Sequence, residues 1–331
     1  MPGKVPPDDL LSEVFTRTGA TDESVLQGPA DGEDAAALAV GDETLVVSSD
    51  PISLAAEHAG TLGVYVACND VAVSGVDPRW LTVVLILPDG DSLDPLIRDL
   101  DVAAREVGVA IVGGHTEYND TLTRPLLCLT AMGTGEFIST GGSNPGDVVV
   151  LTKGAGIEGT AILAADFGDE IAGSFDDELS AETICERAEQ FLDEISVVPD
   201  ARILREYATA MHDPTEGGVA AGLQELARAS GVRLDVDRDS VPVRPETRVL
   251  SEAAGVDPLR IFGSGAVVAT VPEEHVDDAL ADLDDANIEA AVIGRAHEGQ
   301  PALVLDGETI TGPVTDDLYP LWEARDSSES T

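Results

Sequence analysis

The amino-acid sequence predicts two domains, an α+β domain over residues 1–140 and an α/β domain over residues 141–331. The chain has 331 residues, about twice the size of a usual single domain. Hairpin and crossover patterns mix in the first half, whereas helices and strands alternate in the second. The stretch between them, residues 136–147, is rich in Gly, Ser, Asn and Pro, a composition that is typical of a domain boundary.

The elements of the first half follow from hydrophobic periodicity and turn residues. Apolar residues at positions 10, 11, 14 and 15 predict a first helix that ends at Gly19. The apolar runs 35–40 and 44–49 flank a tight Gly41-Asp42 turn, which predicts a hairpin that ends at Asp50. Periodicity then predicts helices over 56–74 and 95–107, and strands over 80–87, 109–112 and 126–132. Because the strand over 109–112 leads directly into Gly113-Gly114, we expect a glycine loop there.

The second half opens with an apolar strand over residues 148–152, followed by the glycine turn Lys153-Gly154-Ala155-Gly156. This turn has neither the spacing of a P-loop nor the third glycine of a dinucleotide fingerprint. The pattern after it predicts helices near residues 179–194, 199–208, 218–230, 245–254 and 274–284, and strands near 232–236, 264–271 and 288–294.

The charge of the chain excludes several partners. Acidic residues number 63 against 18 basic ones, which gives a net charge of -45, and Lys4 and Lys153 are the only lysines. Nucleic acid and acidic membrane surfaces are poor partners because both require clustered Lys and Arg. The acid is spread along the whole chain, which favours a surface adapted to concentrated salt over a dedicated acidic tail.

Compartment and redox state are predicted from the apolar runs and the cysteines. The N-terminal residues form no apolar signal segment, and no run approaches 18 apolar residues, so we expect a cytoplasmic protein. Three widely separated cysteines without metal-ligand spacing predict reduced thiols.

Four short acidic sites lie beside apolar strands or helices: Asp50, Asn69-Asp70, residues 113–117 (GGHTE) and residues 213–218 (DPTEGG). Carboxylates repel phosphate directly, but two or three carboxylates that hold Mg²⁺ attract it. Neighbouring glycines let backbone N–H groups approach the phosphate oxygens. Together these sites predict a protein that uses a nucleotide.

The two sites of the first hairpin and helix each have an alternative structural role. Asp50 ends a strand, where it can reach a metal, or it caps the next helix, because Asp before Pro is a common start signal. Asn69 and Asp70 interrupt an apolar helix, where they coordinate metal and contact phosphate or form a satisfied buried network.

The two glycine-containing sites also have alternatives. Gly113 and Gly114 allow backbone approach, with Thr116 as a phosphate donor and Glu117 as a metal ligand, or they form an ordinary turn. Asp213 lies at the start of a loop whose Gly217 and Gly218 open a helix. The first amides of that helix can bind an anion, or the loop serves only as a helix cap.

The order and spacing of these segments resemble the AIR synthase-like superfamily, which includes aminoimidazole ribonucleotide synthase, selenophosphate synthetase, thiamine monophosphate kinase and the hydrogenase maturation protein HypE. The segment Asn69-Asp70-Val71-Ala72-Val73-Ser74-Gly75 and the Gly113 segment look most like HypE, and residues 213–218 look like its Asp-x-Thr-x-Gly-Gly. The match spans most of the chain.

The resemblance implies an N-terminal domain whose sheet pairs with its twin in a homodimeric barrel, with ATP near the dimer interface. Carried over to this sequence, it implies that Asp34, Asp50 and Asp70 bind Mg²⁺ or phosphate, with Asp50 and Asp70 as catalytic carboxylates. It also implies that the nucleotide site is shaped by Gly113, Gly114, Thr116 and Asp213.

The chain also departs from the pattern of the families that it resembles. Residues 326–331 (DSSEST) lack the terminal cysteine of HypE, so the HypE reaction on its own tail is not expected. His115 stands where thiamine monophosphate kinase would show Asp, and Gly263-Ser264-Gly265 replaces an Asn-Glu-Gly of HypE. The segment of Cys and Lys expected of selenophosphate synthetase is missing.

These observations lead to a predicted Mg-ATP-dependent homodimer that phosphorylates or activates a small-molecule acceptor. One alternative is a non-catalytic nucleotide-binding accessory protein that docks onto a maturation partner. Another is a purine or thiamine biosynthesis enzyme of the same superfamily.

Overall fold

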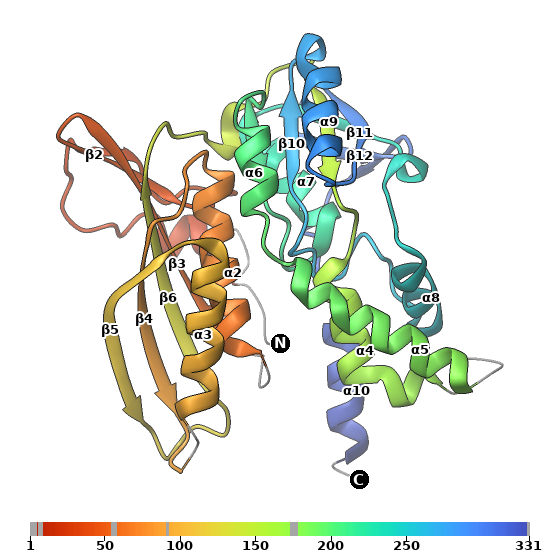
Figure 1. The fold of residues 1–331 in the computed structure, drawn as a ribbon. Helices are drawn as coiled ribbons and strands as arrows, with labels where there is room; N and C mark the ends of the chain where they lie inside the picture. Colours follow the sequence, from red (N-terminus) through yellow and green to blue (C-terminus); the bar gives the residue numbers. More distant parts are fainter. Residues whose placement is uncertain (1–4, 6–8, 54–57, 91–92, 173–177, 330–331) are drawn as a thin grey trace.

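The computed structural model describes residues 5, 9–53, 58–90, 93–172 and 178–329. It contains two sheets, one in each half of the chain, and helices α2 and α3 lie between the first sheet and the second half (Figure 1). The predicted two-domain architecture is thereby confirmed, and limits at 1–140 and 141–331 remain our proposal for its domains. No described helix combines the length and the apolar character that crossing a membrane requires.

The first sheet has six strands in the order β1-β2-β3-β6-β4-β5. Their bounds are β1 Val25–Gln27, β2 Ala36–Val40, β3 Glu43–Ile52, β4 Trp80–Leu87, β5 Ala110–Tyr118 and β6 Leu126–Thr134. Strands β4 and β5 are parallel, and the other described pairs of this sheet are antiparallel. The π-helical turn η1 (Leu10–Val14) precedes the sheet, where the sequence predicts a helix.

Helices α2 (Ala59–Val73) and α3 (Leu93–Val107) cover one face of this sheet (Figure 1). Strand β4 shows the resulting alternation, because Leu81, Val83, Leu85 and Leu87 are buried while the residues between them stay partly exposed. The opposite face therefore presents half-exposed apolar side chains, including Val84.

The second sheet has seven strands in the order β13-β12-β9-β11-β7-β10-β8. Their bounds are β7 Val148–Thr152, β8 Ala210–His212, β9 Arg233–Val236, β10 Val268–Val271, β11 Ala290–His297, β12 Ala302–Leu305 and β13 Glu308–Ile310. Described pairings are antiparallel except for β9 with β12. Strand β7 lies within the predicted strand, and all of its residues, four apolar ones and Thr152, are buried.

The second half also contains helices, of which α4, α5, α8 and α10 share an apolar cluster (Figure 1). Their bounds are α4 Ile157–Ala172, α5 Glu178–Glu189, α6 Val198–Leu204, α7 Gly218–Ser230, α8 Pro245–Ala254, α9 Val276–Asp285 and α10 Tyr319–Glu329. The short helices are η2 Thr140–Gly142, η3 Gln190–Glu194, η4 Arg238–Ser240 and η5 Glu273–His275. One apolar core contains residues of both α2 and α6, so the two halves share buried contacts.

The predicted loop at residues 113–117 is wrong, because strand β5 runs through it from Ala110 to Tyr118. The cause is parallel pairing with β4, which places Gly114 opposite Val83. Gly114 has a φ of +147°, and a Cβ there would lie 1.8 Å from the Val83 carbonyl oxygen. Only glycine fits this approach, so its presence reflects sheet pairing. All residues of β5 are exposed, which leaves no alternation for a sequence pattern to reveal.

Candidate functional site

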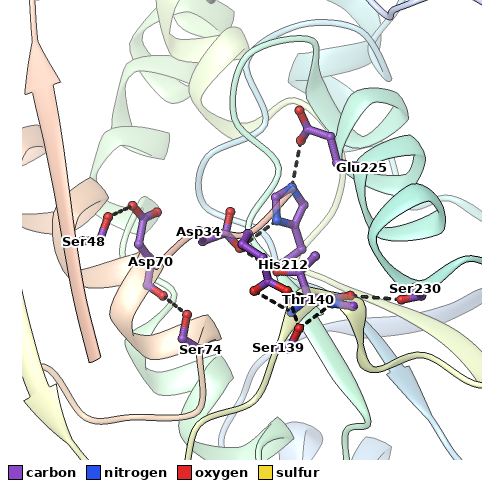
Figure 2. A network of polar contacts seen from close by, with 11 residues as sticks. Asp34, Ser48, Asp70, Ser74, Ser139, Thr140, His212, Glu225 and Ser230 are labelled. Carbon is purple, nitrogen blue, oxygen red and sulfur yellow. Dashed lines mark hydrogen bonds and ion pairs between the residues drawn. The ribbon is translucent and has the colours of Figure 1, made fainter. Parts of the chain in front are cut away.

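Three carboxylates meet where the two halves of the chain join. Asp34 precedes β2, Asp70 lies in α2, and Asp213 follows β8. One oxygen of each lies within 4.8 Å of one oxygen of the other two. Asp70 and Asp213 are buried, with 8% and 1% of their surface exposed, and Asp34 is partly buried. Figure 2 shows Asp34 and Asp70 approaching each other from separate segments.

Asp50 lies beside this cluster rather than inside it. The Ser48 hydroxyl is 2.6 Å from Asp70 Oδ2 and 3.1 Å from Asp50 Oδ2. A hydroxyl has one proton, so Ser48 links the two carboxylates but satisfies one at a time. Strand β3 continues through Asp50 to Ile52, so Asp50 does not end the strand as the sequence predicts.

The electrostatics of the cluster favour a bound cation. Burial raises the pKa of Asp70 well above its ordinary value, and the neighbouring charges of Asp50, Asp213 and Asp34 raise it further. Like-charged carboxylates this close cannot all ionise without a counter-charge. An all-oxygen set of three carboxylates is the donor chemistry that Mg²⁺ prefers, so the residues fit this ion.

His212, which the sequence analysis did not single out, lies within hydrogen-bond distance of Asp34. His212 Nδ1 lies 2.7 Å from Asp34 Oδ2, and its Nε2 lies 3.0 Å from Glu225 Oε2 in α7 (Figure 2). Burial alone would lower the pKa of His212, but the charges and hydrogen bonds of Asp34 and Glu225 outweigh it and raise the pKa well above its ordinary value. The sequence offered one signal for this residue, because His212 directly precedes Asp213.

Asn69 joins the two halves of the chain through its buried side chain. Its Nδ2 donates to the Ile195 carbonyl at 2.9 Å, and its Oδ1 accepts from the Val197 N–H at 2.9 Å. Both ends of the carboxamide are therefore engaged by backbone. Of the two predicted roles, this contact favours the buried network, although its partner is the second half of the chain rather than the sheet under α2.

Lys153 contacts the same segment as Asn69. Its Nζ donates to the carbonyls of Glu194 and Ser196 at 3.0 and 2.9 Å, and it lies 3.2 Å from Asp200 Oδ2. Asp200 is fully buried. The ammonium of Lys153 is therefore surrounded by acceptors of the chain itself.

The loop from Asp213 to Gly218 is shaped by close packing. Helix α7 begins at Gly218, with Gly217 as its N-cap. A Cβ on Gly218 would lie 2.5 Å from the Ile261 carbonyl oxygen, and the Gly217 N–H donates to Asp316 Oδ2 at 2.8 Å. The Gly217 amide, which we predicted to face an anion, therefore meets a carboxylate of the chain itself. The predicted role of both glycines in nucleotide binding stays a prediction.

The β5 residues are not brought to the cluster within one chain. Strand registers place Gly114 opposite Val83, Val83 opposite Leu129, and Leu129 opposite Asp50. Three strand spacings, about 14 Å, therefore separate Gly114 from Asp50. The predicted roles of Gly113, Gly114, Thr116 and Glu117 stay predictions. His115 Nε2 lies 3.1 Å from Glu117 Oε2 on the exposed strand.

Comparisons with known proteins identify the family to which this two-sheet fold belongs. A family model described as AIR synthase related protein, N-terminal domain, matches residues 32–135, and its C-terminal counterpart matches residues 144–306. The chain belongs to the AIR synthase-related family.

Individual relatives are proteins of hydrogenase maturation, which confirms the predicted likeness to HypE. Carbamoyl dehydratase HypE of Rhodobacter capsulatus is 31% identical over 309 residues, which cover 88% of this chain and 87% of the relative. A chain of a HypE–HypF complex matches with a TM-score of 0.75 at 23% identity, over 92% of this chain and 98% of that chain. HypE in complex with ATP matches with a TM-score of 0.67 at 23% identity, over 94% and 96%. At such identities these structures show the shared fold.

Proposed function

We propose that the chain is a HypE-like enzyme that binds Mg-ATP and phosphorylates or activates a small-molecule acceptor. The observation that carries this proposal is the convergence of Asp34, Asp70 and Asp213, since the first two come from one half of the chain and the third from the other. Buried charges in proteins are paired with opposite charges or coordinate metal ions, and carboxylate oxygens are the ligands of Mg²⁺.

The residues of the chain divide the work at this site. Asp34, Asp70 and Asp213 would hold Mg²⁺. Asp50 would add a negative charge next to Asp70, and the Ser48 hydroxyl links the two carboxylates. A bound Mg²⁺ supplies positive charge that offsets the phosphates of the nucleotide. Lys153, the only lysine among the described residues, does not supply that charge, because its ammonium lies 3.2 Å from Asp200.

Relatives support the nucleotide. HypE in complex with ATP shares the fold over 94% of this chain. A thiamine monophosphate kinase complexed with AMPPCP and TMP shares it over 94% as well, with a TM-score of 0.71 at 18% identity. Two relatives of different function thus bind an adenine nucleotide or its analogue on this fold, which favours ATP as the cofactor of this chain.

We also propose a homodimer that forms on the free face of the first sheet. Half-exposed apolar side chains, Val84 among them, line this face, and Ile111 and Val112 on β5 are exposed. Burying such a face in a second copy would stabilise the pair. A second copy is also the route by which Thr116 and Glu117 would reach a nucleotide. Val84→Asp should convert the dimer to a folded monomer in sedimentation equilibrium, whereas a monomeric wild type would refute this arrangement.

The central experiment is calorimetric titration with ATP in concentrated KCl, a condition chosen for the proposed salt-adapted surface. We expect heat with Mg²⁺ in the wild type, and at least about a tenfold weaker affinity in Asp70→Asn. The matched control is Asp42→Asn, which removes a carboxylate from an exposed turn. Absence of binding heat with and without Mg²⁺ would end the proposal.

A second candidate is a non-catalytic accessory protein that docks onto a maturation partner. The HypE–HypF complex favours it, because a relative of this fold assembles with another maturation protein. Turnover separates the two candidates. Release of ADP with a small-molecule panel supports the enzyme, whereas ATP binding without ADP, together with a partner captured by wild type and lost in Asp50→Ala, supports the accessory role.

A further inference from the structure

His212 is held between two carboxylates and is shielded from solvent. Its side chain is 5% exposed, and each ring nitrogen lies within hydrogen-bond distance of a carboxylate oxygen, one of Asp34 and one of Glu225. Either ring nitrogen, when it carries a proton, can donate a hydrogen bond to the carboxylate oxygen that it faces.

Packing fixes this ring in position. Helix α7 passes close beside it at Gly222, where a Cβ would lie 3.1 Å from the ring atom Cδ2 of His212. Glu225 follows three residues later, which places it on the same face of the helix. The loop that carries Asp34 also packs on this helix, because a Cβ on Gly32 would lie 3.0 Å from the Glu225 carbonyl oxygen.

The arrangement suits a metal ligand that must be oriented. A hydrogen bond that fixes one oxygen of a carboxylate also fixes the direction of its other oxygen, so His212 restricts the side chain of Asp34. Metal ligands are commonly held in this way by neighbouring groups.

We propose that His212 and Glu225 are positioning residues that hold the Asp34 carboxylate in the orientation that binds a divalent cation. This inference rests on the proposed metal site and adds residues that the carboxylate cluster alone does not identify. Glu225 orients the ring from its far side, and His212 transmits that orientation to Asp34.

Two substitutions at His212 separate the two hydrogen bonds. The amide nitrogen of Asn takes nearly the place of Nδ1, so His212→Asn keeps the bond to Asp34 and loses the bond to Glu225. The amide nitrogen of Gln takes nearly the place of Nε2, so His212→Gln keeps the bond to Glu225 and loses the bond to Asp34. Both variants remove the ring, which makes them matched controls for each other.

The readout is Mn²⁺ binding to the full chain, followed by the electron paramagnetic resonance signal of free Mn²⁺ in concentrated KCl without nucleotide. We expect a dissociation constant within about threefold of wild type for His212→Asn, and one at least about tenfold weaker for His212→Gln. The thermal midpoint of each variant, measured in parallel, reports whether it folds.

Each outcome decides the question. Weaker Mn²⁺ binding in His212→Gln than in His212→Asn, at similar thermal midpoints, supports the inference, and the opposite order overturns it. Equal Mn²⁺ affinity in wild type and both variants overturns it, as does an equal loss in both with equally lowered thermal midpoints, which marks a purely structural role. A wild type that binds neither Mn²⁺ nor Mg-ATP overturns the proposed function together with this inference.

Discussion

Two short stretches of the chain carry the same residue types and lie in opposite environments. Residues 113–117 read Gly-Gly-His-Thr-Glu, and residues 215–218 read Thr-Glu-Gly-Gly after Asp213-Pro214. The first stretch forms an exposed edge strand, whereas the second turns from β8 into α7 with Asp213 almost fully buried. Composition alone does not distinguish a site from a strand, because the topology decides which carboxylates meet.

Glycine has the same use in both stretches. Gly114 lets β5 approach the Val83 carbonyl, and Gly218 lets the start of α7 approach the Leu259 and Ile261 carbonyls. Each glycine therefore accommodates backbone of its own chain. The difference lies in the acids, since Glu117 faces solvent and Asp213 faces two other carboxylates.

The largest effect that tests this difference is expected at Asp213. Asp213→Asn removes one of three charged oxygen donors and should weaken Mn²⁺ binding by at least about 100-fold. Titration of the variant with Mn²⁺, with Asp42→Asn as the control, measures this loss. An affinity within threefold of wild type would mean that the buried acid is no more a metal ligand than the exposed one.

A smaller effect is expected at Asn69, which helps to seat the second half of the chain against α2. Asn69→Ala leaves the Ile195 carbonyl and the Val197 N–H without this partner, and unsatisfied buried groups are costly. We expect a loss of about 2 kcal/mol in the free energy of unfolding by urea. Gln300→Ala, which removes an exposed amide, should cost less than about 0.5 kcal/mol. Equal values for both variants would remove the role assigned to Asn69.

The pH dependence of Asp316 tests how the buried stretch is anchored. Burial raises the pKa of this carboxyl to about 7, although hydrogen bonds from the Leu318 and Gly217 amides oppose the shift. The folded chain therefore retains a proton that the unfolded chain releases at lower pH. As a result, the contribution of Asp316 to stability falls as the pH rises from about 4 towards 7.

Asp316→Asn removes this titration. Between pH 5 and pH 8 the wild type should lose at least about 1 kcal/mol more unfolding free energy than the variant. Urea unfolding at both pH values and constant KCl measures the difference. Parallel changes in the two proteins would show that Asp316 does not titrate in this range.

The smallest effect is expected on the exposed strand. Glu117→Gln should change the Mn²⁺ affinity measured without nucleotide by less than about twofold, because Glu117 is outside the three-carboxylate group of its own chain. A tenfold loss would place this residue in the metal site and would require a second copy to supply it.

The sequence predicted a large part of the fold because the β2–β3 hairpin, β4 and α7 carry strong periodic or turn signals. It also pointed to Asp70 and Asp213, since isolated acids beside apolar elements are conspicuous. It gave a buried network as one role of Asn69 but did not predict its partners, and it did not predict the contact between His212 and Asp34. These contacts join residues 126 to 178 positions apart, and only the packing of the two halves brings them together. Strand β5 was missed in part because an exposed edge strand has no alternating pattern.

The segment from Glu194 to Val197 has one further consequence. Its backbone groups are hydrogen-bonded in alternation, by Lys153 at residues 194 and 196 and by Asn69 at residues 195 and 197. A recombinant fragment of residues 141–331 would retain the lysine and lose the asparagine. Dividing the gene at the domain boundary would therefore remove the hydrogen bonds of Asn69 from this segment. Co-expression of the two fragments would allow these hydrogen bonds to form again.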